Sequence, residues 1–367
     1  MKNNITTLEI NNFKSIKHIK MDCKRINVLI GKPNVGKSNI LEALSLYATP
    51  FCDSRKKILE DYVRYEKLTN LFYDQDRKKQ ITVSSNLGFA SIRFNQGGDI
   101  SHVYDIALGP LDLLKQINSL KSYNRADYVN LLRSFSIKKQ AIHNEISPYC
   151  CFVSSTSTFY PVSENKIGDY DSPIKKYHFK SLSKHPGHFP HFLMPPFGDN
   201  LYEILESSPA LFDECSHFFN DYGLELLVDT VSEKIDVQKK VGNRVYKIPY
   251  SLAADTLQRV IFHLAAIETN KNSVLLFEEP ENHSFPPFIS MLANKIIESK
   301  ENQYFIATHS PYLLRPFIEE CPIKEVNIFI ATYENHETKV RALTAKEIKN
   351  IMDTDIDLFY NISAFSK

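Results

Sequence analysis

The chain reads Gly31-Lys32-Pro33-Asn34-Val35-Gly36-Lys37-Ser38, a stretch that matches the pattern G-x-x-x-x-G-K-[ST] at every fixed position. Glycines in such a loop let the backbone wrap around phosphate groups with its N–H groups pointing inward. The apolar run 26–30 before the loop favours a strand, and the spacing of apolar residues in 38–47 favours a helix. The stretch therefore predicts a phosphate-binding loop between a strand and a helix.

Two side chains of this loop carry the expected chemistry. Lys37 is expected to reach the β- and γ-phosphates of a nucleotide, and the hydroxyl of Ser38 is expected to bind Mg²⁺. The N-terminus of the following helix adds the positive end of its dipole. The candidate nucleotide-binding residues here are Gly31, Asn34, Val35, Gly36, Lys37, Ser38 and Asn39.

Two adjacent carboxylates follow an apolar run in residues 273–281, SVLLFEEPE. Nucleotide hydrolysis needs one carboxylate to hold hydrated Mg²⁺ and one to orient the attacking water. Neighbouring positions at the end of a buried strand can supply both. We predict Glu278 on the metal side and Glu279 on the water side; a solvated acidic turn is the ordinary alternative.

A histidine ends a second short apolar run, in residues 304–311, YFIATHSP. His309 at such a strand end can sense a γ-phosphate. Taken alone, the motif would more often be a hydrogen-bonded loop histidine. The order of the three motifs along the chain favours the catalytic interpretation, so Glu279 and His309 are the candidate catalytic residues.

These three motifs resemble the ABC-type ATPase heads related to RecF, SMC and OLD proteins, and above all the small stand-alone bacterial AAA-family proteins of the AAA-15 or AAA-21 type. The segments that carry the resemblance are ITTLEINNFKSIKHI at the start, FEEPENHSFPP, FIATHSPYLL, PPFGDNL at 195–201 and the tail from Asn327. The likeness covers residues 1–50 and 250–367 well and the middle thinly.

The resemblance implies an ATP-binding head that hydrolyses ATP with Mg²⁺ by in-line attack of water, with ATP sites at a dimer interface. Relatives often pair with a separate effector, a nuclease or toxin, in defence against phage, so a sensor or motor for such a partner is the first hypothesis. A RecF-like DNA-repair ATPase that binds nucleic acid is an alternative. A scaffold that binds ATP with little turnover is another.

The chain departs from this family at two places. The family's LSGGQ-like signature corresponds to Ser251–Arg259, which contains no glycine; Asp255 and Thr256 could still offer a helix N-terminus to a γ-phosphate in trans, and an ordinary capped helix is the alternative. The family's glutamine loop is expected after the run 150–153, where only Ser154, Ser155 and Thr156 occur.

The resulting fold prediction is one α/β ABC-type P-loop ATPase head with an antiparallel β layer and a helical insertion. Residues 1–110 would form the N-terminal part of the ATPase core, 111–247 a helical and irregular insertion lobe, and 248–367 the C-terminal part with the carboxylates and the histidine. Helical patterns are read at 111–146 and 201–227. The Pro- and His-rich stretch 154–200 is expected to be a surface excursion that contacts a partner.

Composition excludes several classes of protein. The 367 residues carry 44 Lys and Arg against 43 Asp and Glu, so bulk charge does not support a strongly basic nucleic-acid binder. No apolar run is long enough to span a membrane and no signal peptide is evident, so a cytoplasmic protein with no membrane partner is expected. The six cysteines form no C-x-x-C pair, which favours reduced, mostly buried thiols.

Three further patterns invite a functional interpretation but favour a plain one. His185, His188 and His191 lack an obvious fourth metal ligand. The acidic cluster Asp353, Asp355 and Asp357 has no preceding nuclease element and is expected to be a solvated turn. Lysine pairs at 56–57, 78–79, 138–139, 175–176 and 239–240 are scattered along the chain, so no DNA-binding stripe is predicted.

Overall fold

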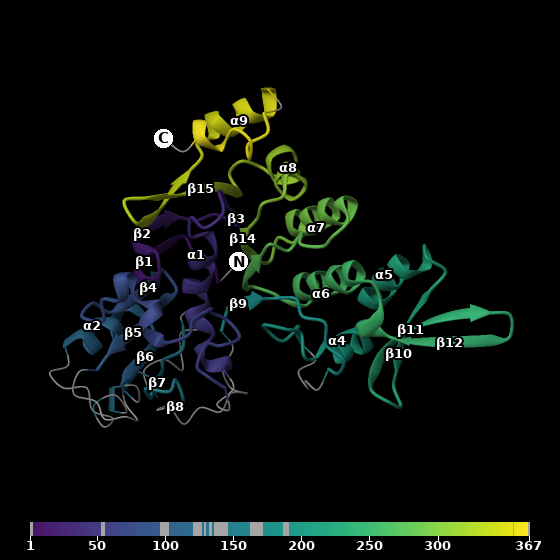
Figure 1. The fold of residues 1–367 in the computed structure, drawn as a ribbon, viewed down its shortest axis with the longest axis horizontal. Helices are drawn as coiled ribbons and strands as arrows, with labels where there is room; N and C mark the ends of the chain where they lie inside the picture. Colours follow the sequence, from purple (N-terminus) through teal and green to yellow (C-terminus); the bar gives the residue numbers. More distant parts are fainter. Residues whose placement is uncertain are drawn as a thin grey trace.

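The structure is a computed structural model that holds three β-sheets, with helices between and beside them (Figure 1). It describes residues 3–52, 56–95, 103–119, 127, 130–131, 134–135, 146–161, 172–185, 191–354 and 356–365. Of the residues singled out in the sequence, His188 and Asp355 lie outside the described residues, as does most of 120–145.

The first sheet has seven antiparallel strands in the order β2-β1-β4-β5-β6-β7-β8. Its strands are β1 (Thr7–Phe13), β2 (Ile16–Asp22), β4 (Ile81–Ser85), β5 (Gly88–Phe94), β6 (Tyr104–Gly109), β7 (Tyr149–Val153) and β8 (Phe159–Pro161). The antiparallel β layer predicted from the sequence is therefore confirmed.

The second sheet has six strands in the order β16-β15-β3-β14-β13-β9. Its strands are β3 (Ile26–Gly31), β9 (Ile174–Tyr177), β13 (Val274–Glu278), β14 (Gln303–Ala307), β15 (Val326–Glu334) and β16 (Glu337–Ala342). All neighbours are parallel except β15 and β16. The three motif-bearing strands β3, β14 and β13 are thus adjacent, and their carboxyl ends lie at the same edge.

Helices lie on both faces of the parallel sheet, and α2 packs on the antiparallel sheet. The helices that the structure describes are α1 (Lys37–Leu44), α2 (Leu111–Ser119), α4 (Leu201–Ser207), α5 (Pro209–Asn220), α6 (Asp255–Thr269), α7 (Pro286–Glu298), α8 (Pro311–Glu319) and α9 (Ala345–Thr354). Short 3₁₀ helices are η1 (Ser45–Phe51), η2 (Leu68–Leu71), η3 (Tyr73–Gln75), η5 (Tyr250–Leu252) and η6 (Ile362–Ala364).

Two hydrophobic cores meet at the parallel sheet. On one face, Leu29, Leu276 and Phe305 pack with α1 and the antiparallel sheet. On the other face, Val28 and Phe277 pack with α6, α7 and α8. A strand that is buried on both faces has apolar side chains at successive positions. The sequences of these strands are therefore continuous apolar runs and do not alternate between apolar and polar residues. This packing fixes the sheet edge where the motifs end.

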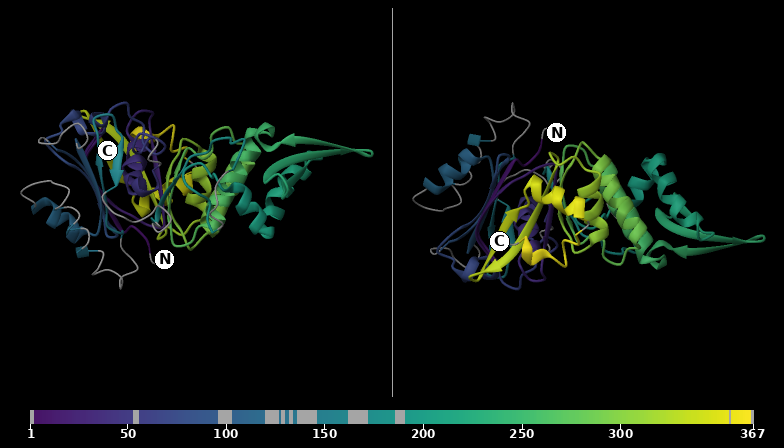
Figure 2. Two further views of the ribbon diagram at one scale, coloured as in Figure 1. Left: turned by 90° about the horizontal axis from the view of Figure 1, so that it is seen from below. Right: turned by 90° about the horizontal axis from the view of Figure 1, so that it is seen from above.

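The third sheet, β10 (Glu225–Asp229), β11 (Lys234–Val241) and β12 (Arg244–Pro249), was not expected from the sequence. It projects from the end of the molecule opposite the antiparallel sheet, as three views agree (Figures 1 and 2). The helical prediction for 201–227 is confirmed for α4 and α5 and is wrong for 225–227, because Leu226 and Leu227 continue an apolar pattern within a strand.

The stretch 154–200 is also less irregular than expected, because its residues 174–177 form β9, an edge strand of the parallel sheet beside β13. Between residues 111 and 247 the chain contributes strands to all three sheets. The division at 110 and 247 stays a prediction.

All six cysteines are free, and five of them are buried. None of the described helices has the length and apolar character that crossing a bilayer requires.

Candidate nucleotide site

The loop between β3 and α1 is shaped by two glycines that no other residue could replace. A Cβ on Gly31 would lie 2.5 Å from the backbone oxygen of Ala331. Gly36 has φ of +99°, and a Cβ there would lie 2.1 Å from Oγ1 of Thr338. Both positions therefore need glycine for close approach, and Gly36 needs it also for its backbone conformation.

Neighbouring residues fix the outside of this loop. Thr338 Oγ1 donates to the carbonyl of Val35 (2.9 Å) and contacts Ser15 Oγ (2.6 Å). Asn39 donates to the same Ser15 oxygen (2.7 Å). Asn34 is exposed at the loop apex with φ of 62°, a left-handed conformation that asparagine tolerates. Asn39 and Val35 thus serve the loop's shape in this state.

The ammonium of Lys37 lies inside the loop. Its Nζ donates to the carbonyl oxygens of Gly31 (2.9 Å) and Lys32 (3.0 Å), and the residue is 6% exposed. Burial lowers the pKa of Lys37 to about 8, although Glu279 and Glu281 act to raise it. A buried cation held by two carbonyls is ready to exchange them for phosphate oxygens.

This pKa predicts proton uptake on ATP binding at alkaline pH. Above pH 8 the free chain holds Lys37 mostly neutral, whereas a bound triphosphate favours the ammonium. We expect ATP binding to take up most of one proton at pH 9 and a much smaller fraction at pH 7. Calorimetry in two buffers of different ionisation enthalpy measures this number. Lys37→Arg is the matched control, because a guanidinium does not titrate there; equal uptake in both variants would contradict the prediction.

The two carboxylates of the FEEPE segment lie at the end of β13. The register pairs Glu278 with Ala307 of β14, and Ala307 in turn with Leu29 of β3. The Glu279 N–H donates to the Ala307 carbonyl (2.8 Å), and Glu279 has φ of 46°. The left-handed backbone conformation is strained for a glutamate, and such strained residues cluster at functional sites.

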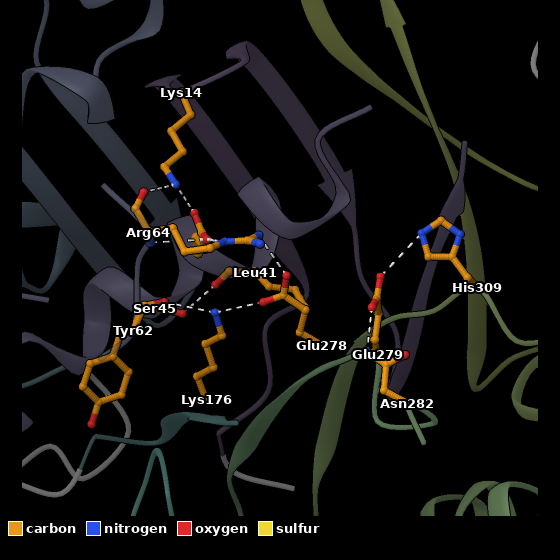
Figure 3. Close-up of polar contacts among 11 residues, drawn as sticks. Lys14, Leu41, Ser45, Tyr62, Arg64, Lys176, Glu278, Glu279, Asn282 and His309 are labelled. Atoms are coloured by element: carbon orange, nitrogen blue, oxygen red, sulfur yellow. Dashed lines mark hydrogen bonds and ion pairs between the residues drawn. The ribbon is translucent and has the colours of Figure 1, made fainter. Parts of the chain in front are cut away.

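Glu279 and His309 face each other across this edge (Figure 3). Glu279 Oε1 lies 3.6 Å from His309 Nε2, and Glu279 Oε2 accepts from Asn282 Nδ2 (2.8 Å). Burial and Lys37 lower the pKa of His309, against the effect of Glu279. A neutral imidazole beside a part-exposed carboxylate can accept or donate a hydrogen bond to a water or a phosphate.

Glu281 is a residue that the sequence analysis missed. It is 9% exposed, and its Oε1 accepts from Thr308 Oγ1 (2.6 Å) and from the His309 N–H (2.8 Å). Burial raises its pKa, against the two hydrogen bonds that lower it. This carboxyl ties the β13 turn to the β14 turn. The sequence Glu279-Pro280-Glu281, with a further carboxylate two residues after Glu279, was an available signal.

Glu278 is enclosed by cations (Figure 3). Its Oε2 lies 3.1 Å from Lys176 Nζ and its Oε1 lies 3.0 Å from Arg64 Nη2. The Ser38 hydroxyl also hydrogen-bonds this carboxylate. Burial alone would raise the pKa of Glu278, but Lys176, Ser38 and Arg64 together hold it below its usual value. Ser38 and Glu278 are therefore together, as the metal-side prediction requires.

A second buried carboxylate extends this network. Glu42 of α1 is fully buried and forms ion pairs with Lys14 and with Arg64 Nε (2.8 Å). Arg64 thus bridges the carboxylates of the P-loop helix and of β13. Lys176 also donates to the Tyr62 carbonyl (3.0 Å). None of these residues has a local motif, so the sequence could not reveal them.

The strand that borders β13 comes from the proline-rich stretch 154–200. The run 150–153 forms β7 of the antiparallel sheet. The neighbour of β13 is β9, which carries Lys176 and is followed by His178. The position of a glutamine loop after residue 153 stays a prediction.

Asp255 and Thr256 begin α6 at some remove from the P-loop. Thr256 Oγ1 donates to the His283 carbonyl (2.7 Å), and Asp255 forms an ion pair with Arg259 (2.6 Å). Neither has a hydrogen bond or ion pair to the described residues of the P-loop. Within one chain, the predicted signature contacts the turn after Glu279 rather than the phosphate-binding loop.

A P-loop, an acidic strand end and a histidine on adjacent parallel strands define a P-loop nucleotide hydrolase. The family model "AAA ATPase domain" matches residues 1–183, and the model "AAA domain, putative AbiEii toxin, Type IV TA system" matches residues 171–315. The two models together match residues 1–315, so the chain is an AAA-family ATPase of α/β fold, and its reaction is ATP hydrolysis.

Curated relatives extend over different parts of the chain. An "ATP/GTP phosphatase" of Helicobacter pylori is 23% identical over 329 residues, which cover 83% of this chain and 85% of the relative. An uncharacterized protein of Methanocaldococcus jannaschii is 31% identical over 98 residues, 24% of this chain and 45% of the relative.

Among solved structures, similarity is found to the Smc head domain with an extended coiled coil bound to the C-terminal domain of ScpA derived from Pyrococcus furiosus. The TM-score is 0.49 at 14% identity, covering 95% of this chain and 98% of that one. The SMC head domain from Thermotoga maritima gives a TM-score of 0.40 at 12% identity, covering 93% and 100%.

The cations around Glu278 predict an unusual dependence on Mg²⁺. Lys176 holds an oxygen of the carboxylate that a metal would need, so it competes with the metal. Lys176→Met should lower the Mg²⁺ concentration for half-maximal hydrolysis by roughly 3- to 10-fold, the range expected for one partly solvated ion pair. Lys180→Met, on the same segment but exposed, is the control. An unchanged or higher Mg²⁺ requirement in Lys176→Met would refute the competition.

Proposed function

We propose that this head hydrolyses ATP with Mg²⁺ at a site shared between two copies of the chain, and that this cycle gates a separate effector in defence against phage. The observation that carries the proposal is the meeting of Lys37, Ser38, Glu278, Glu279 and His309 at one sheet edge. Their order and chemistry match what phosphoryl transfer to water requires.

The residues at this edge fit a magnesium ion. Mg²⁺ prefers oxygen donors and is held by few protein ligands besides phosphate and water. The Ser38 hydroxyl and the Glu278 carboxylate are such donors, and they are hydrogen-bonded to each other. When bound, the ion would neutralise charge on the β- and γ-phosphates. Arg64 and Lys176 would then release one or both Glu278 oxygens.

The remaining side chains would each have a separate role in hydrolysis. Lys37 would hold the β- and γ-phosphates in place of the Gly31 and Lys32 carbonyls. Glu279 would orient the attacking water, since its part-exposed carboxylate lies beside the histidine. Neutral His309 would contact the γ-phosphate, with its turn held by Glu281.

An exposed apolar face supports the shared site. Leu252 is 73% exposed directly before the start of α6, and Phe285 is 58% exposed after the turn that Thr256 contacts. Large apolar side chains that border a helix N-terminus favour a partner surface. A second copy could present Asp255 and Thr256 to the γ-phosphate held by Lys37, a phosphate that one chain leaves open.

Mixing two inactive variants tests sharing in trans. Lys37→Ala lacks the phosphate cation, and Thr256→Arg blocks the α6 start. Each should be inactive alone, because both of its composite sites are damaged. A mixed dimer contains one site with two wild-type halves, so an equimolar mixture should regain about a quarter of the wild-type hydrolysis rate if the copies associate at random. With mixed dimers confirmed by mass, an inactive mixture would argue against the shared site.

The gating of an effector rests on the family and on the shape of the chain. One matching family model carries the description "putative AbiEii toxin, Type IV TA system". The described part of this chain contains the candidate nucleotide site. Residues 172–185 and 191–227 run from β9, which borders β13, to the first strand of the projecting β10–β12 sheet. We propose that this segment passes the nucleotide state to the effector. Hydrogen exchange with and without ATP tests it; exchange that is equal in both states across 172–227 would refute it.

A further inference from the structure

The end of the β11–β12 hairpin stands free of the rest of the molecule. Strand β10 pairs with β11 only over residues 234–238, so residues 239–246, which we call the hairpin tip, form a two-stranded ribbon. Every residue of the tip is exposed. In all views the tip lies at the far end of the long axis (Figures 1 and 2).

The tip carries cations that pair with nothing in the described part of the chain. The side chains of Lys239, Lys240 and Arg244 have no hydrogen bond or ion pair there, and no acidic residue occurs in 237–249. Lys247, at the base, is different, because Asp229 Oδ2 lies 3.1 Å from its Nζ. The charge of the tip is therefore not neutralised from within, in a chain whose formal net charge is only +1.

The tip also exposes apolar side chains. Val241, Val245 and Tyr246 are 51%, 53% and 50% exposed. A two-stranded ribbon is marginal on its own in water, and contiguous apolar and aromatic groups on such a ribbon indicate a contact surface. The cations and the apolar groups are interleaved along the same strands.

The register places the cations on both faces of the ribbon. Lys239 lies opposite Tyr246 and Val241 opposite Arg244, so Lys239 and Arg244 share one face with Tyr246. Lys240 lies opposite Val245 on the other face. A flat acidic protein surface would meet only one of these faces. Two rows of phosphates on the walls of a groove would meet both.

We infer that the hairpin tip binds duplex DNA by entering the major groove, which is wide enough for a two-stranded ribbon. Lys239 and Arg244 contact the phosphates of one wall and Lys240 those of the other. Tyr246 and Val241 lie beside the first two cations on one face and Val245 lies beside Lys240 on the other, where they pack against the sugar edges of the groove walls. The inference rests on the hairpin alone and is independent of the proposed effector and of the shared ATP site.

Fluorescence anisotropy with a labelled 30-base-pair duplex tests the inference on the full chain. The tip variant is Lys239→Gln/Lys240→Gln/Arg244→Gln, and the control is Lys271→Gln/Lys324→Gln/Lys346→Gln, which removes the same charge from exposed sites elsewhere. At 50 mM salt the tip variant should lose on the order of 100-fold in affinity, and the control less than about 3-fold. In the tip variant, the slope of log affinity against log salt concentration should become shallower by about 3, near 0.9 per lost phosphate contact.

Several results would overturn the inference. These are no duplex binding by the wild-type chain at 50 mM salt, equal losses in the two variants, or an unchanged salt slope. Competition by polyglutamate as effective as by unlabelled duplex would assign the tip to an acidic protein instead. A change in oligomer mass with unchanged DNA affinity would assign it to a second copy. Equal ATP hydrolysis and equal melting temperatures show that the tip variant is folded.

Discussion

Replacing Lys37 with alanine is expected to lower the affinity for ATP by at least about 100-fold. The ammonium is the charged group of the P-loop interior, held in place by the Gly31 and Lys32 carbonyls. Charge-assisted hydrogen bonds to phosphate in a partly dry site are among the strongest single contacts that a protein makes. Alanine removes them and leaves the two carbonyls facing the phosphates.

Isothermal calorimetry with Mg-ATP measures this loss. Lys32→Ala is the matched control, since Lys32 lies in the same loop but is exposed and contributes only its backbone oxygen. The control should bind ATP within about 3-fold of the wild-type chain. The melting temperature of Lys37→Ala should be at least as high, because a buried amine with a lowered pKa is replaced. ATP affinity within 5-fold of wild type in Lys37→Ala would show that the loop binds nucleotide in another way.

Replacing Glu279 with glutamine is expected to slow hydrolysis by about 1,000-fold while ATP still binds. Glutamine keeps the size of the side chain and a carbonyl oxygen that Asn282 can contact. It loses the negative charge that polarises water, an effect worth 100- to 10,000-fold for a positioned base. Phosphate release at saturating Mg-ATP measures the rate, and calorimetry measures the binding.

Glu301→Gln is the control for this variant, since it makes the same change at an exposed position just before the start of β14. It should hydrolyse ATP at the wild-type rate. If Glu279→Gln also retains more than a tenth of that rate, the water-orienting role belongs to another group. Slow turnover in the wild-type chain itself, at the level of Glu279→Gln, would favour the scaffold alternative.

The motif-bearing strands were predictable because each carries its own local signal. The loop Gly31–Ser38 is flanked by its strand and helix within a few residues, and 273–278 and 304–308 are apolar runs that end in polar groups. Parallel strands that end in such groups place them at one edge. The neighbours β13 and β14 then bring Glu279 within 3.6 Å of His309.

The groups around Glu42 and Glu278 could not be predicted, for a physical reason. Lys14, Arg64 and Lys176 come from three separate segments, and the contacts form only when both sheets pack against α1. The sequence around a buried lysine does not show that it is buried, because the acidic residue that pairs with it can lie far away in the chain. Strand β9 was hidden by the proline-rich residues around it, so its place beside β13 did not emerge from pattern alone.

The β10–β12 sheet was missed because its signal is short and divided. Leu226 and Leu227 extend the helical pattern of α5, while only Ile235 and Val237 of β11 are buried. The tip alternates cations with exposed apolar groups, a pattern without a buried face. In the sequence, the lysine pair at 239–240 is one of several pairs scattered along the chain. Only the pairing of β11 with β12 places Arg244 close to it.

The central claim is that two copies of this head close on ATP, and the mass of Glu279→Gln in solution tests it most directly. Light scattering is run with Mg-ATP, with Mg-ADP and without nucleotide. We predict twice the mass of one chain with ATP, and a mass closer to a single chain in the other two conditions. A mass that stays the same in all three conditions, with ATP binding confirmed, would contradict the account.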